Sequence, residues 1–567
     1  MKSIYEERPW LKLYPPGIPS EIEIPEKSVG EAFDESAEKW KDRTAIIFYG
    51  NKISYKELKE KIDRFANGLF HLGIKKGDRV ALLLLNSPEF IIAFFAAIKI
   101  GAILTPISPV YVSSEIKQQL EDSGAETIIS QDILYEGVEK AGVKLKNTIL
   151  SNIGESLPRL SKFLGKSVLR GIYQKMVPVS HNIYGQEGFY QFQELINKYP
   201  PNPPRVAINA KEDLATLPYT GGTTGPPKGV TITHYNLIAE VTQYQAFNPI
   251  FEAGKEVLVG YMPFYHIGGQ ARSVMDAILW GNSLVVITSP DLDDILSAIV
   301  SYKATSFTGV PAIYEALKDY EKTDRVNWKK LKAVTCGGDF LDESTFLSWK
   351  SRTGVEIHEG YGMTELAGVI FSHPIGRSKV GTPGFPLPNN IAAIVDPEKD
   401  EFLPPGQIGE LVVIGPAVTQ AYWNNPEATR DCEAIIDGKR WFRTGDLARM
   451  EEEGYFCIYD RKRDLIKYKG LRVFAREVEE VLNSHPQIKE AAVIGVRDIK
   501  VGENVKALVV LEADARGKLS EMEIVEYCQD KLAHYKIPKI VEFVGEIPKT
   551  DIGKPSRREV REAEISK

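Results

Sequence analysis

The chain is 567 residues long, with 43% hydrophobic residues, 26% charged residues and a net charge of -7. This length is too great for one hydrophobic core, so we expect about three to five domains or subdomains. The acidic balance argues against a nucleic-acid partner, and the four scattered cysteines, with no CxxC pair, argue against a zinc site or a disulfide framework.

Neither a signal peptide nor a membrane span is expected. The segment Met1–Pro9 is charged, whereas a signal peptide is apolar. The longest apolar run, Phe90–Ile98, is soon interrupted by Lys99 and is too short to cross a bilayer, so we expect it to form a buried helix. Together with the reduced cysteines, these features predict a cytoplasmic protein.

Strand and helix patterns alternate over residues 1–150. Apolar runs predict strands at 44–49, 80–85 and 103–107. Between the first two, Ser54 with Glu57 three residues later has the spacing of a helix capping box. Such alternation is typical of a parallel sheet with helices on its faces, which is an α/β fold.

The C-terminal part of the chain shows a second, smaller set of elements. Helices are predicted at 473–482 and 522–532, and strands at 491–496 and 507–511. We therefore expect an α/β protein with a large N-terminal domain of mixed and parallel sheets and a small, mobile α+β C-terminal domain. The boundary is placed between residues 460 and 461.

Residues 155–178 have an apolar residue at every third or fourth position and basic residues between them. No Asp or Glu occurs from Ser156 to Gln186. A helix here would have one apolar and one cationic face. Two interpretations stay open: a helix packed on the core with a solvated basic side, and a peripheral helix attracted to anionic lipid on the inner face of a membrane.

The stretch Thr220–Val230 reads TGGTTGPPKGV and lies between two short predicted strands. Its glycines expose successive backbone N–H groups, and its threonine hydroxyls and Lys228 add donors for phosphate oxygens. It is not a Walker A loop, because prolines precede the lysine and Gly229 follows it. A nucleoside triphosphate is the expected ligand, and a solvated Gly/Thr hairpin is the alternative.

Further segments follow that carry chemically useful residues. They are 262–269 (MPFYHIGG), 334–339 (VTCGGD), 361–365 (YGMTE), 441–447 (WFRTGDL), 460–467 (DRKRDLIK) and 547–554 (IPKTDIGK). In this order, and with the loop at 220–230, they resemble the adenylate-forming superfamily of acyl-CoA synthetases, luciferases and peptide-synthetase adenylation domains. The stretch from Pro106 to Ala125 is similar to that of medium- and long-chain fatty acyl-CoA synthetases within it.

The resemblance implies a set of ATP-binding residues spread over the chain. The phosphates would lie on the loop, the adenine between the Gly-Gly segment and Tyr361, and the ribose on Asp446. The residues implied in nucleotide binding are Thr220, Gly221, Gly222, Thr223, Thr224, Gly225, Lys228, Gly337, Gly338, Asp339, Tyr361, Gly362, Met363, Asp446, Arg461 and Arg463.

The same resemblance implies the catalytic residues. Lys554 follows the Pro-x-Thr-x-x-Gly pattern and would stabilise charge during adenylation, and Thr364 would donate to the α-phosphate. Glu365 would bind Mg²⁺, and His266 would lie at the carboxylate end of the acyl pocket. Departures are Gly221 in place of serine, Arg463 at the hinge, and Gln270 where some long-chain members place a gating Trp.

The implied activity is an AMP-forming acid–thiol ligase that uses ATP, Mg²⁺ and coenzyme A. The substrate class is a medium- to long-chain fatty acid, and the long-chain members' homodimer is expected as well. The N-terminal domain, 1–460, would bind AMP and the acyl group, and 461–567 would form the lid with Lys554. Alternatives are adenylation of an aryl, short hydroxy or amino acid for a separate acceptor, a luciferase-like oxygenase, and a non-enzymatic nucleotide-binding protein.

Overall fold

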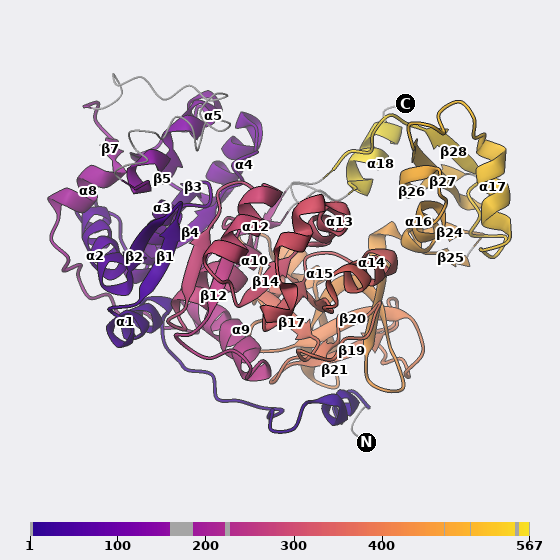
Figure 1. Cartoon of the computed structure of the whole chain (residues 1–567), viewed down its shortest axis with the longest axis horizontal. Coiled ribbons are helices and arrows are strands. Elements are labelled where there is room, and N and C mark those ends of the chain that lie inside the picture. The colour runs from indigo at the N-terminus through magenta and orange to yellow at the C-terminus, as the bar shows by residue number, and fades with distance from the viewer. Residues whose placement is uncertain are drawn as a thin grey trace.

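The computed structural model describes residues 4–158, 185–220, 227–469, 471–498, 500–549 and 555–565. Within these ranges the strands form four sheets and one separate hairpin (Figure 1). The predicted residues Gly221, Gly222, Thr223, Thr224, Gly225 and Lys554, and most of the helix expected at 155–178, lie outside the described residues.

The first sheet confirms the α/β pattern expected for the N-terminal part. Strand β3 pairs in parallel with β4 on one side and β5 on the other. Helix α3 (Pro88–Lys99) follows β3 and is buried from Pro88 to Ile98, as expected for the apolar run. In the described residues the strand order is β11 (Ile232–Thr233), β8 (Leu214–Thr216), β4 (Ile103–Pro106), β3 (Arg79–Leu83), β5 (Thr127–Gln131), β6 (Asn147–Ser151) and β7 (Phe189–Gln191).

The second sheet is mixed. Its central strands run parallel, and its two ends are antiparallel, at β1 with β2 and at β16 with β17. In the described residues the order is β18 (Phe385–Pro386), β17 (Gly368–Ser372), β16 (His358–Met363), β15 (Ala333–Cys336), β14 (Ser306–Gly309), β12 (Val257–Gly260), β13 (Ser283–Val286), β1 (Thr44–Phe48) and β2 (Asn51–Ser54).

The strand expected before the glycine-rich loop is split in two. Strand β8 joins the first sheet, whereas β9 (Tyr219–Thr220) pairs only with β10 (Lys228–Gly229) as an antiparallel hairpin. Pro218 separates them, because it has no N–H to continue the ladder. Its carbonyl accepts the Val230 N–H at 2.9 Å. The hairpin therefore holds Thr220 opposite Lys228 at the base of the loop.

The last two sheets meet at the segment 462–464, a short 3-10 turn. The third sheet comprises β19 (Ile391–Val395), β20 (Gly409–Ile414), β22 (Lys439–Met450), β21 (Glu433–Ile436) and β23 (Phe456–Arg461). The fourth comprises β25 (Leu471–Val473), β24 (Ile466–Tyr468), β27 (Gly502–Leu511), β26 (Ile488–Asp498) and β28 (Ile540–Phe543). Figure 1 shows the fourth sheet and its helices grouped at one end of the molecule. The domain boundary at 460/461 stays a prediction.

Two C-terminal helix predictions are wrong at their ends. Helix α16 begins at Ala475, because Val473 completes strand β25, and α17 ends at Gln529 instead of Leu532.

The capping box of Ser54 and Glu57 is confirmed at the start of α2. The principal helices are α1 (Val29–Lys39), α2 (Tyr55–His71), α4 (Ser113–Ser123), α5 (Tyr135–Ala141), α8 (Phe192–Lys198), α9 (His234–Phe247), α12 (Leu292–Ser301), α13 (Pro311–Asp319), α14 (Glu343–Thr353), α15 (Pro426–Asp431), α16 (Ala475–Asn483), α17 (Glu521–Gln529) and α18 (Arg557–Ile565).

The lengths and apolar character of the helices decide whether one of them could cross a membrane. None of the helices in the described part of the chain combines the length and the apolar character needed to cross a bilayer. The buried apolar side chains instead form separate cores, the largest of which packs α1, α2 and α3 against strands of the first two sheets. Another core lies wholly within the fourth sheet and its helices.

Candidate active site

The parallel strands β15 and β16 bring two predicted segments to the same sheet edge. The strands are neighbours, with Cys336 opposite Glu359, so the Gly337-Gly338 turn leaves β15 beside the Tyr361 segment. Gly338 has a φ of +84°, a left-handed conformation that favours glycine. A Cβ at Gly337 would lie 3.5 Å from the Gly360 carbonyl oxygen, so the two backbones run close together.

The glycine of the YGMTE motif has a packing reason. A Cβ at Gly362 would lie 1.8 Å from the carbonyl oxygen of Gly368 on strand β17. Only glycine therefore allows β16 and β17 to pair here. This close pairing places Thr364 and Glu365 in the tight 3-10 turn at 364–366 between the two strands.

Tyr361, Asp446 and Arg461 come together from three different strands. The Tyr361 hydroxyl donates to Asp446 Oδ2 at 2.5 Å, and Arg461 Nε lies 2.9 Å from Asp446 Oδ1. The negative charge of Asp446 raises the pKa of Arg461 above its usual range. Burial, together with the same carboxylate, raises the pKa of the Tyr361 phenol. This cluster offers a ring face and a carboxylate side by side, which suits an adenosine.

Glu365 is buried, with 6% exposure, and its carboxylate is held by a residue that the sequence analysis did not select. The Tyr422 hydroxyl donates to Glu365 Oε1 at 2.7 Å. Burial raises the pKa of Glu365, and the hydrogen bond from Tyr422 acts in the opposite direction. Tyr422 lies in the loop between β20 and α15, outside every motif named from the sequence.

The base of the phosphate loop lies next to Tyr422. Lys228 is half-buried at the start of β10, and its Nζ lies 5.4 Å from the centroid of the Tyr422 ring. Thr220 is half-buried opposite it. The structure thus groups Lys228 with Glu365 through Tyr422, whereas 221–225 lie outside the described residues.

His266 caps the start of a short helix. It is exposed, and its Nδ1 accepts the Gly268 N–H at 3.2 Å, which caps the turn α10 (Ile267–Gly269). A π-helical segment, Gln270–Met275, follows, a type of irregularity found often at functional sites. Gln270, at the position where some long-chain members have a gating Trp, is fully buried, and its Nε2 donates to the Tyr265 carbonyl.

Arg463 and the neighbours of Lys554 lie at the junction of the third and fourth sheets. Burial lowers the pKa of Arg463 to about 10. Arg557, three residues after Lys554, ion-pairs with Asp460, Asp464 and Glu479. The segments on either side of Lys554 meet where the Ser556 N–H donates to the Pro548 carbonyl at 2.7 Å. The sequence analysis missed Arg557, whose partners lie up to 97 positions away.

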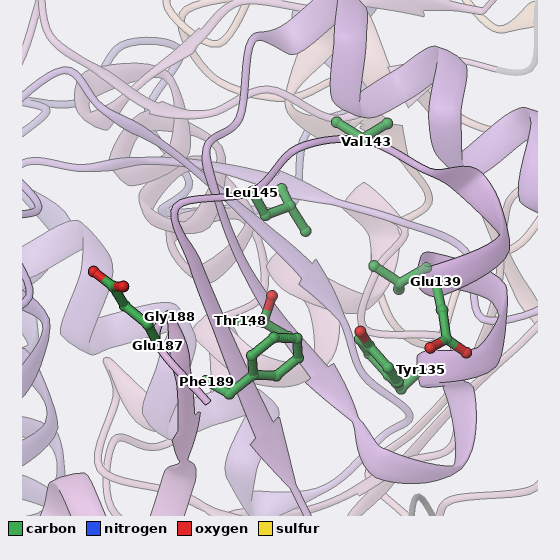
Figure 2. Close-up of a pocket in the computed structure, with 9 residues that line it drawn as sticks. Tyr135, Glu139, Val143, Leu145, Thr148, Glu187, Gly188 and Phe189 are labelled. Atoms are coloured by element: carbon green, nitrogen blue, oxygen red, sulfur yellow. The ribbon is translucent and has the colours of Figure 1, made fainter. Parts of the chain in front are cut away.

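A pocket elsewhere in the molecule contains none of the candidate active-site residues. Figure 2 shows it between helix α5 and strand β7, lined by Tyr135, Leu145, Phe189 and other residues. It lies by β7, at the opposite edge of the first sheet from β11. None of its lining residues is a predicted site residue.

Comparison with known proteins agrees with the geometry. The family model described as AMP-binding enzyme matches residues 33–423, and the model described as AMP-binding enzyme C-terminal domain matches residues 477–554. Two relatives are each called long-chain-fatty-acid–CoA ligase. The one from Bacillus subtilis is 34% identical over 562 residues, and the one from Escherichia coli O6:H1 is 35% identical over 561, each alignment covering 98% of both chains.

A solved structure, the ATP-bound MatB from Rhodopseudomonas palustris, is similar with a TM-score of 0.80 and 27% identity. The match covers 95% of this chain and all of that one, at 100%. The adenylate-forming fold expected from the motifs is thereby confirmed. On the family models and the near-complete relatives, this chain belongs to the AMP-binding enzyme family.

Proposed function

We propose that this chain is an ATP-dependent acyl-CoA synthetase. It would convert a fatty carboxylate, ATP and coenzyme A into acyl-CoA, AMP and pyrophosphate through an acyl-adenylate, with medium- to long-chain acids as substrates. The observation that carries the proposal is the convergence of Tyr361, Asp446 and Arg461 beside the buried Glu365. The printed names of the relatives that align over nearly the whole chain support the fatty-acid class.

In the first step a substrate carboxylate oxygen attacks the α-phosphorus of ATP, and the bond to the leaving pyrophosphate breaks. Tyr361 and the Gly337-Gly338 turn would hold the adenine, and Asp446 would accept hydrogen bonds from the ribose hydroxyls. Thr364, Lys228 and Lys554 would donate to phosphate oxygens as negative charge builds on them. Such preorganised donors lower the barrier because they need no reorganisation during the reaction.

The residues present fit a magnesium ion. Mg²⁺ takes oxygen ligands and is usually bound by one or two carboxylates plus substrate phosphates. Glu365 supplies one such buried carboxylate, and the described residues contain no group of three or more His, Cys, Asp or Glu placed to bind a metal without a substrate. When bound, Mg²⁺ would neutralise charge on the phosphate oxygens.

In the second step the thiol of coenzyme A attacks the acyl carbon, and AMP leaves. The adenylate is already activated, so Lys554 has no role in this step. We propose that 461–567 acts as a lid that rotates about Arg463 between the two steps and so opens a path for the thiol. The 3-10 turn at 462–464 between the third and fourth sheets is consistent with a hinge there.

A second candidate substrate class is favoured by one observation. Behind His266, the side chains of Gln270, Arg272 and Glu240 are all buried. In the described part of the chain, Gln270 Oε1 and Arg272 Nε are buried without a hydrogen-bonding partner. A long alkyl chain packed against them would leave both atoms unsatisfied, which is costly. An aryl, short hydroxy or amino acid would tolerate them better.

One experiment separates the two classes. Pyrophosphate release is measured with ATP and Mg²⁺ across acids from acetate to stearate and with cinnamate-type acids, each with and without coenzyme A. A maximum between octanoate and stearate, with AMP turnover that depends on coenzyme A, is the expected result. A maximum at short or aromatic acids would support the second class, and release with none of them would refute the fatty-acid proposal.

We also propose where the enzyme works. Its substrate is an amphiphile, and 155–178 has a cationic, periodically apolar pattern, so a cytoplasmic enzyme in peripheral contact with the inner face of the membrane fits both. Sedimentation with anionic vesicles, compared with neutral ones, tests this contact. The homodimer expected from the resemblance is tested by light scattering.

A further inference from the structure

Tyr422 is attached through its backbone to the base of the phosphate loop. The N–H of the next residue, Trp423, donates to the Gly229 carbonyl at 2.8 Å. On the other side, the Thr231 N–H donates to the Ala421 carbonyl at 3.1 Å. Val230 and Tyr422 themselves form an isolated antiparallel bridge. The loop that contains Tyr422 therefore has a defined position relative to strand β10 and Lys228.

The side chain of Tyr422 reaches from this loop to the other side of the site. Its hydroxyl donates to Glu365 Oε1 at 2.7 Å, and its ring lies 5.4 Å from Lys228 Nζ. The backbone of the Glu365 turn is tied to the same loop, because the Thr419 N–H donates to the Glu365 carbonyl at 2.8 Å. Tyr422 thus contacts both the carboxylate proposed for Mg²⁺ and a lysine proposed for phosphate.

We infer that Tyr422 is a positioning residue for adenylation, which rests on the proposed function. Its hydroxyl orients the Glu365 carboxylate through one oxygen and leaves the other for the metal, while its ring face sets the position of the Lys228 ammonium. Groups that orient a metal ligand from outside its coordination shell typically contribute about 10–100-fold in metal affinity or activity.

The burial of Glu365 explains why its carboxylate needs the Tyr422 hydroxyl as a hydrogen-bond donor. A carboxylate that is 6% exposed has little water to satisfy its oxygens. Without the Tyr422 donor, Glu365 Oε1 would lose its hydrogen bond in a buried place, and the carboxylate would be free to rotate. That rotation would move the second carboxylate oxygen away from the metal position.

The test compares Tyr422→Phe with a matched control, Tyr320→Phe. Tyr320 is also half-buried, and its hydroxyl donates to Asp293 Oδ1 at 2.8 Å, so the control loses a similar tyrosine–carboxylate hydrogen bond. Thermal unfolding first confirms that both variants fold. Binding of Mn²⁺ in the presence of ATP is then followed by electron paramagnetic resonance, and both half-reactions are assayed separately.

For Tyr422→Phe we expect Mn²⁺ binding and the adenylation rate to fall about 10–100-fold, while thioester formation from supplied acyl-adenylate stays within about twofold of wild type. Tyr320→Phe should match wild type in every assay. Tyr422→Leu, which also removes the ring beside Lys228, should lose about 2–5-fold more in adenylation.

Two results would overturn the inference. One is wild-type Mn²⁺ affinity and adenylation in Tyr422→Phe, and the other is an equal fall in both half-reactions, which would indicate a merely structural role. Failure of the proposed function is distinguishable, because the wild type would then adenylate none of the acids while the Mn²⁺–ATP comparison between the variants still gives an answer.

Discussion

The guanidinium of Arg272 lies 2.6 Å from the carboxylate of Glu240, and both side chains are buried. The pair joins the π-helical segment after His266 to helix α9. Glu240 Oε1 also accepts the N–H of Val369, on the strand that follows the Thr364–Glu365 turn. A second carboxylate, Asp276, lies 3.3 Å from Arg272, and the Tyr244 ring packs against its guanidinium. Arg272 therefore links the π-helical segment to helix α9 and, through Glu240, to strand β17.

Removing this arginine should destabilise the protein strongly. Arg272→Met would leave Glu240 and Asp276 buried without their cation, and breaking a buried ion pair from one side typically costs about 3–5 kcal/mol. Urea unfolding measures the loss. As a control, Lys117→Met removes an exposed pair with Glu121 and should cost less than about 1 kcal/mol. A loss below about 1 kcal/mol in Arg272→Met would contradict this account.

Glu89 should make stability depend on pH. It is buried in the first turn of α3, and burial raises its pKa to about 7 from an ordinary value of 4.5. A carboxyl whose pKa is higher in the folded state stabilises the fold at low pH, and that contribution disappears as the pH rises through about 7.

Glu89→Gln, which cannot ionise, should therefore gain stability relative to wild type as the pH rises from 4.5 to 8. The gain should be at most about 3.5 kcal/mol, at about 1.4 kcal/mol for each of the roughly 2.5 pKa units. Urea unfolding at several pH values tests this. Glu194→Gln, an exposed glutamate in the first turn of α8, is the matched control and should show no such trend. A pH-independent difference for Glu89→Gln would show that this carboxyl does not titrate as stated.

Asp446→Asn should weaken ATP use. The substitution removes the charge that pairs with Arg461 and that would accept the ribose hydroxyls. Hydrogen bonds to charged groups contribute about 1.5–3 kcal/mol each, so we expect the KM for ATP to rise about 10–100-fold while the KM for coenzyme A is unchanged. Asp431→Asn, an exposed aspartate at the end of α15, is the control. An unchanged KM for ATP would refute the ribose assignment.

Lys554→Ala should separate the two half-reactions. We expect adenylation to fall by about 10²–10³, because a preorganised charge at the reacting phosphate is lost. Turnover of supplied acyl-adenylate with coenzyme A should remain, since the carboxyl is already activated. Lys549→Ala is the matched control, a nearby half-exposed lysine that pairs with Glu490. Equal loss of both half-reactions in Lys554→Ala would refute the assignment.

Local features of the fold were predictable because they depend on neighbouring residues. The capping box of Ser54 and Glu57 and the buried helix at Phe90–Ile98 each arise from a few adjacent side chains. Element ends were less predictable. The helical pattern at 473–482 includes Val473, yet Val473 pairs with Ile466 in an antiparallel hairpin. Whether Val473 joins a helix or a strand therefore depends on a strand seven positions earlier.

The sequence by itself determined the family and the order of the motifs, because each motif is a short run of neighbouring residues that can be recognised without knowing the fold. Only the tertiary structure decided which residues meet. Tyr361 reaches Asp446 across 85 positions and Tyr422 reaches Glu365 across 57, on strands and loops placed together by sheet pairing. No local pattern marks Tyr422 or Arg557, because the carboxylates they contact lie far away in the sequence and come near only in the folded chain.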